Sequence, residues 1–137
     1  MSSGSQGSES EGGKVVFDSS AVLAWLMGER GGDVVEAALP GLISAVNLAE
    51  VIYVAVHRGL SSDAVRVALQ ELPLEVIPFD VEHAYTAAAI HAQSRTYGFS
   101  LGDCACLALA SSRGLPALTS DGEWSKAGLA VSVQQIR

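Results

Sequence analysis

The sequence predicts an α/β fold, a three-layer α/β/α arrangement around a four- to five-stranded, mainly parallel sheet. Two observations predict it. Short apolar runs alternate with segments of helical character, and most of those segments follow a Ser or Asp and stop at Gly. Alternating short strands and helices favour parallel pairing, with helices covering both faces of the sheet. The length of 137 residues fits one domain with one core.

The predicted strands are short and apolar, which is typical of strands buried on both faces. In chain order they are residues 14–18, 41–44, 74–79, 116–120 and 130–134. The predicted helices each follow a residue that can cap a helix N-terminus, and most end at a glycine or proline. In chain order they are residues 21–28, capped by Ser19 or Ser20, then 33–39, 45–58, 64–72, capped by Ser61 or Ser62, 80–97 and 100–113, followed by a short turn or helix at 123–127.

Residues 1–13 are rich in Ser and Gly, and we interpret them as a flexible tail preceding a domain at 14–137. The tail lacks the apolar core of a secretory signal, and no apolar run is long enough to cross a bilayer. We therefore expect a cytoplasmic protein with no membrane partner. Cys104 and Cys106 lie two apart on a predicted helix, which is poor geometry for a disulfide, so we expect two small buried thiols.

Four carboxylates occupy unusual places. Asp18 ends the apolar run Val-Val-Phe, and Asp121 follows the run Pro-Ala-Leu-Thr-Ser. Glu50 and Asp103 lie inside segments that otherwise read as apolar helices. A buried carboxylate is costly unless something neutralises it. In parallel sheets, functional residues gather beyond the carboxyl ends of the strands, so these acids predict a divalent-cation site there.

Each acid also has a structural interpretation that the sequence leaves open. Asp18 can be the N-cap of the following helix, and Asp121 precedes Gly122 in a common turn dipeptide. Asp103 follows Ser100 at the spacing of a capping box. Glu50 can extend from the edge of an apolar helix face into water. The net charge of −7 also argues against a broad basic face for nucleic acid.

Taken together, the order and context of the four acids resemble those of a known family. The matching segments are VVFDSSAVLAWL, SAVNLAEV, SLGDCACLALA and PALTSDGEW. They resemble the PIN-domain family of metal-dependent ribonucleases, specifically the VapC-type toxins of bacterial toxin–antitoxin pairs, over residues 14–137. The resemblance implies a PIN-like fold and an endoribonuclease active on RNA. It also implies a Mg²⁺ or Mn²⁺ cofactor, a homodimer and a cognate antitoxin.

The resemblance also assigns roles to individual positions. It implies catalytic and metal-binding roles for four acids, Asp18, Glu50, Asp103 and Asp121, and supporting roles for Ser20, Asn47 and Thr119. Arg113 and Lys126, near predicted loop ends, are our candidates for contacting the RNA backbone. The alternatives are a PIN nuclease of RNA processing, a Mg²⁺-binding receiver-like signalling domain, and a binding module with an inert acidic pocket.

Overall fold

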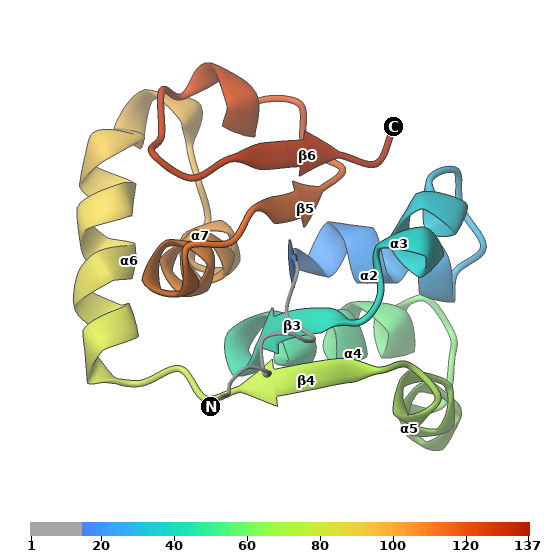
Figure 1. Ribbon diagram of the computed structural model, residues 1–137. Coiled ribbons are helices and arrows are strands. Elements are labelled where there is room, and N and C mark those ends of the chain that lie inside the picture. Colours follow the sequence, from blue (N-terminus) through green and yellow to red (C-terminus); the bar gives the residue numbers. More distant parts are fainter. Residues whose placement is uncertain (1–14) are drawn as a thin grey trace, which may run out of the picture.

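The computed structural model describes residues 15–137, so the predicted tail at 1–13 lies outside the described residues. Five parallel strands form one sheet in the order β4-β3-β2-β5-β6, which confirms the predicted α/β class (Figure 1). The strands are β2 (Val16–Phe17), β3 (Gly41–Ser44), β4 (Leu74–Ile77), β5 (Ala117–Thr119) and β6 (Val133–Gln135). The α-helices are α2 (Ser19–Leu26), α3 (Gly32–Ala38), α4 (Ala45–His57), α5 (Ser62–Gln70), α6 (Val81–Gln93) and α7 (Leu101–Arg113). Two short 3-10 helices, η1 (Arg95–Tyr97) and η2 (Trp124–Lys126), complete the structure.

Each face of the sheet carries its own hydrophobic core. Phe17 and Ile43 pack with α2, α3, α4 and α5 on one face, whereas Val16 and Leu42 pack with α6, α7 and η2 on the other. Neighbouring strand residues point to opposite faces, so a continuous apolar run serves both cores at once. This explains why the strands read as short, uninterrupted apolar segments in the sequence.

Several predicted element boundaries differ from those of the structure, and three of the differences have an evident physical reason. The third strand ends at Ile77 rather than residue 79, because Pro78 has no N–H for the ladder. The helix predicted over 80–97 stops at Gln93, where the Ser94 hydroxyl donates to the Ile90 carbonyl, and η1 follows. The last strand is Val133–Gln135 rather than 130–134, because only those residues lie beside β5.

The two free cysteines are buried in α7, as expected for small apolar side chains. Burial raises the pKa of the Cys104 thiol to about 11 and that of Cys106 well above its usual value. Within residues 15–137, none of the helices has both the length and the apolar character that crossing a membrane requires.

The central strand β2 places the start of α2 in the middle of the molecule. The Asp18 amide donates to the Leu118 carbonyl at 2.9 Å, so β2 and β5 end side by side. The helices α4 and α7 both contact α2 or the sheet next to this point. The carboxyl ends of two neighbouring strands and the start of α7 therefore surround one small region.

Candidate active site

Asp18 is buried at the end of β2, with 4% of its surface exposed. Its Oδ2 accepts hydrogen bonds from the Ser20 hydroxyl at 2.6 Å and the Thr119 hydroxyl at 2.9 Å. Its side chain makes no capping bond to the α2 backbone, so the N-cap interpretation is not what occupies this carboxylate. The carboxylate instead joins the ends of two strands.

Thr119 links Asp18 to Asp121. Its side chain is fully buried, and its Oγ1 accepts from the Asp121 amide at 3.1 Å while donating to Asp18. Asp121 Oδ1 accepts from the Glu123 amide at 2.8 Å, which confirms the predicted turn. The Ser120 amide donates to the Ser20 hydroxyl at 3.0 Å, so the loop after β5 is fastened to the start of α2.

Glu50 is half-buried on α4 and does not simply extend into water. Its Oε1 accepts from the Ser19 hydroxyl at 2.6 Å. The Asn47 side-chain amide donates both to Ser19 Oγ at 3.0 Å and to the Gly102 carbonyl at 2.9 Å. This small network ties α4 to the starts of α2 and α7.

Asp103 forms the capping box predicted from the sequence. Its Oδ2 accepts from the Ser100 amide at 2.9 Å, and its own amide donates to the Ser100 hydroxyl at 3.1 Å. The carboxylate also lies at the N-terminal end of α7, where the helix dipole favours negative charge. Asp103 therefore caps α7 and also lies near the other acids.

The four acids act on one another electrostatically. Burial, opposed by the hydrogen bonds from Ser20 and Thr119 and reinforced by the charges of Asp103 and Glu50, raises the pKa of Asp18 to about 6. Burial also raises the pKa of Asp103, together with the charges of Asp121 and Glu50. Asp103 and Glu50 thus lie near enough to Asp18, and Asp121 and Glu50 near enough to Asp103, for their charges to contribute to these raised pKa values.

No cation neutralises this cluster within residues 15–137. The ion pairs there join other acids: Glu29 with Arg58 and Arg137, Asp80 with His83, and Glu123 with Lys126. The same residues contain no group of three or more His, Cys, Asp or Glu side chains close enough together to hold a metal ion. Instead, hydroxyl and amide donors occupy individual carboxylate oxygens.

The donor set nonetheless fits a hard divalent cation. Carboxylate oxygens and water are the ligands that Mg²⁺ prefers, and a cation would offset the burial and the smaller charge repulsion that raise the pKa of Asp18. Asp18, Glu50, Asp103 and Asp121 are the residues that would hold the ion.

The two candidate RNA-contacting cations lie in different places. Arg113 is the last residue of α7, ten residues or about 15 Å along the helix from Asp103, so the structure does not bring it to the acids. Lys126 lies in η2, on the loop that follows Asp121, and pairs with Glu123 at 3.2 Å. Of the two, only Lys126 lies on the segment that directly follows one of the acids, Asp121.

Ser19 is a site residue that the sequence analysis missed. Its position next to Asp18 suggested only a helix cap, whereas its hydroxyl contacts Glu50 from a different element. Ser19 starts a helix directly after a strand-end acid, and that signal could have drawn attention to it.

Comparison with known proteins defines the class. The PIN-domain family model matches residues 15–129, so the chain belongs to the PIN-domain family of nucleases. Its fold is that of several toxin structures, at identities of 19–22%. No curated protein matched the chain.

Three solved structures illustrate the likeness. A toxin–antitoxin complex from Klebsiella pneumoniae is 22% identical with a TM-score of 0.73, covering 90% of this chain and 98% of that one. DNA-bound VapBC from Salmonella typhimurium is 20% identical with a TM-score of 0.71, covering 91% and 99%. VapC20 from Mycobacterium tuberculosis, a toxin that cleaves the sarcin-ricin loop, is 19% identical with a TM-score of 0.70, covering 85% and 96%.

The strand order also excludes the receiver-like alternative. Numbered along the chain, the five strands lie in the order 3-2-1-4-5. Receiver domains have the order 2-1-3-4-5, so their phosphoacceptor strand occupies a different place in the sheet. The receiver interpretation is therefore wrong.

Proposed function

We propose that the protein is a metal-dependent endoribonuclease that hydrolyses RNA phosphodiesters and acts as the toxin of a type II toxin–antitoxin pair. One observation carries the catalytic part: the charges of Glu50 and Asp103 act on the buried Asp18, and no cation among residues 15–137 pairs with any of these three acids. Membership of the PIN-domain family supports the nuclease class.

Several side chains orient the acids that would hold the cation. A bound Mg²⁺ or Mn²⁺ supplies Lewis acidity at the phosphate and lowers the pKa of a water nucleophile. Ser20 and Thr119 hold Oδ2 of Asp18, which fixes the direction of its carboxylate. Thr119 also holds the backbone of Asp121. Lys126 is the remaining candidate for contacting the RNA backbone.

A cleavage assay tests the catalytic proposal. Structured RNA is incubated with and without Mn²⁺, comparing wild type, Asp18→Asn and the matched control Asp63→Asn, an exposed acid at the start of α5. We expect Mn²⁺-dependent cleavage by wild type and the control only. Water attack does not use the 2′-hydroxyl, so the products should carry 5′-phosphates, and 2′,3′-cyclic phosphates would rule out this mechanism.

The toxin role is supported by the matched structures, which include toxin–antitoxin complexes. An antitoxin would present a basic side chain to the acidic cluster, because a guanidinium matches carboxylates closely. Trp25, Met27 and the 62% exposed Tyr53 offer apolar surface on α2 and α4 for the same partner. Induced expression should arrest growth, and the product of the adjacent gene should restore it. Cleavage without growth arrest would favour an RNA-processing nuclease.

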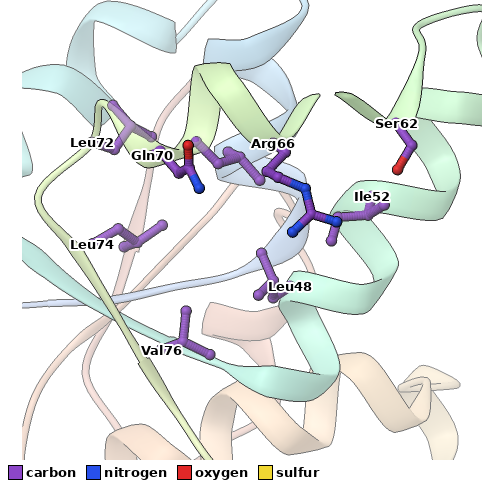
Figure 2. A pocket seen from close by; sticks show the side chains of 9 residues that line it. Leu48, Ile52, Ser62, Arg66, Gln70, Leu72, Leu74 and Val76 are labelled. Carbon is purple, nitrogen blue, oxygen red and sulfur yellow. The ribbon is translucent and has the colours of Figure 1, made fainter. Parts of the chain in front are cut away.

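We also propose a homodimer, supported by an apolar hollow at the sheet edge. The hollow, of about 330 Å³, lies between α4, α5 and the edge strand β4 (Figure 2). Leu48, Ile52, Leu74 and the 43% exposed Val76 line it. Size-exclusion chromatography with light scattering tests this, and Val76→Asp should give a monomer.

A further inference from the structure

We infer that Ser19 is a positioning residue for Glu50, which orients that carboxylate for the cation of the proposed nuclease. The inference rests on the proposed function. Ser19 carries no charge and is buried, with 3% of its surface exposed, so it can act on Glu50 only through its hydrogen bonds. Its importance comes from the direction of one hydrogen bond.

The network leaves Ser19 little choice of hydrogen-bond direction. The Asn47 amide group has two hydrogens, one of which goes to the Gly102 carbonyl and the other to Ser19 Oγ. Ser19 Oγ is thereby an acceptor, and its single hydrogen goes either to Glu50 Oε1 at 2.6 Å or to the Asn47 carbonyl at 3.3 Å. The shorter bond, to a charged acceptor, is the stronger one.

Gly102 approaches Glu50 Oε1 from another side, and only a residue without a Cβ leaves room for this oxygen. A Cβ added at Gly102 would lie 2.5 Å from Glu50 Oε1, closer than real contacts allow. Glu50 Oε1 therefore sits between the Ser19 hydroxyl and the bare Cα of Gly102. Among the hydrogen bonds of residues 15–137, none reaches Glu50 Oε2, so this oxygen is the one available to a cation or to a water bound to it.

The two oxygens of the Glu50 carboxylate therefore have different roles. The Ser19 hydroxyl donates to Oε1, and the Asn47 amide donates to Ser19. These bonds fix the orientation of the carboxylate and therefore the direction in which Oε2 points. Such hydrogen bonds to a ligand carboxylate typically change metal affinity about 10- to 100-fold when removed. Asn47 is fully buried and Ser19 is 3% exposed, so water has little access to the hydrogen bond between these two side chains.

The test measures Mn²⁺ affinity by the paramagnetic resonance signal of free Mn²⁺, comparing wild type with Ser19→Ala and Ser19→Thr. Ser94→Ala is the matched control, since it removes another buried serine hydroxyl, at the end of α6. We expect Ser19→Ala to weaken affinity about 10-fold. Ser19→Thr should restore most of it, and Ser94→Ala should leave it unchanged.

A double-mutant cycle with Glu50→Gln decides whether Ser19 acts through Glu50. In the Glu50→Gln background, Ser19→Ala should cause no further loss of Mn²⁺ affinity. An equal loss in both backgrounds, or wild-type affinity in Ser19→Ala, would overturn the inference.

A metal-free arm separates this inference from the proposed function. Urea unfolding without metal is measured for wild type, Ser19→Ala, Glu50→Gln and the double mutant. The effects of Ser19→Ala and Glu50→Gln on the free energy of unfolding should not be additive. If wild type binds no Mn²⁺ but this coupling is present, the metal-dependent function fails while the positioning of Glu50 stands. Additive effects in urea would refute the positioning, whatever the metal result.

Discussion

The Thr119 hydroxyl donates to Oδ2 of Asp18 at 2.9 Å, across 101 residues of sequence. The bond joins the carboxyl ends of β2 and β5, which lie side by side in the sheet. It keeps a buried carboxylate hydrogen-bonded in a place where burial itself favours the protonated form. Much of the predicted behaviour of this protein follows from that bond and from the burial it accompanies.

The first prediction concerns stability against pH in the absence of metal. Burial raises the pKa of Asp18 from its ordinary value of 3.8 to about 6 in the folded protein. Between these values the folded state binds more protons than the unfolded state, so stability falls as pH rises from about 4 to 6. At 1.36 kcal/mol per pKa unit, the loss is on the order of 1–3 kcal/mol.

Asp18→Asn should lack this pH-dependent loss. Its stability relative to wild type should therefore be about 1–3 kcal/mol more favourable at pH 7 than at pH 4, measured by urea unfolding in EDTA. The control Asp63→Asn should follow wild type. A constant difference between Asp18→Asn and wild type across this range would show that Asp18 has an ordinary pKa.

The second prediction concerns metal and helix capping at Asp103. Millimolar Mn²⁺ or Mg²⁺ should raise the melting temperature of wild type, and Asp103→Asn should weaken that response. Ser100→Ala breaks the same capping box but keeps the carboxylate, so it should cost about 1 kcal/mol of stability and retain the metal response. Equal metal responses in Ser100→Ala and Asp103→Asn would mean that Asp103 acts only as a cap.

The third prediction is that metal stabilisation depends on pH. A cation requires deprotonated carboxylates, and Asp18 is protonated below about pH 6. The Mn²⁺-induced rise in melting temperature should therefore be larger at pH 7.5 than at pH 5. Differential scanning fluorimetry with and without Mn²⁺ measures this, and a rise that is independent of pH would argue against Asp18 as a ligand.

The fourth prediction tests the Thr119 bond directly. Thr119→Val removes the donor to Asp18 and the acceptor of the Asp121 amide in a fully buried position. We expect about 1–3 kcal/mol of lost stability from the unsatisfied groups. The pKa of Asp18 should also rise further, because the Thr119 bond lowers it. The pH-dependent loss of stability should then extend above pH 6. If Thr119→Val shows the same dependence of stability on pH as wild type, this role of Thr119 is contradicted.

The sequence was a good guide where local chemistry decides the structure. The capping box at Ser100 and Asp103 and the turn at Asp121 are local, and both were predicted correctly. The strand that ends at Ile77 was predicted too long, although Pro78 gave a local reason to end it. The last strand was misplaced because only pairing with β5, more than ten residues away, selects which residues join the sheet.

The sequence by itself determined the α/β class, the apolar strands, most helix starts and the four acids at strand ends and on helices. These follow from periodicity and from short-range hydrogen bonding, which a few neighbouring residues decide. Only the tertiary structure decided that Ser19 holds Glu50 and that Thr119 holds Asp18. Those relations join residues 31 and 101 positions apart in the sequence, and the packing of whole elements sets them.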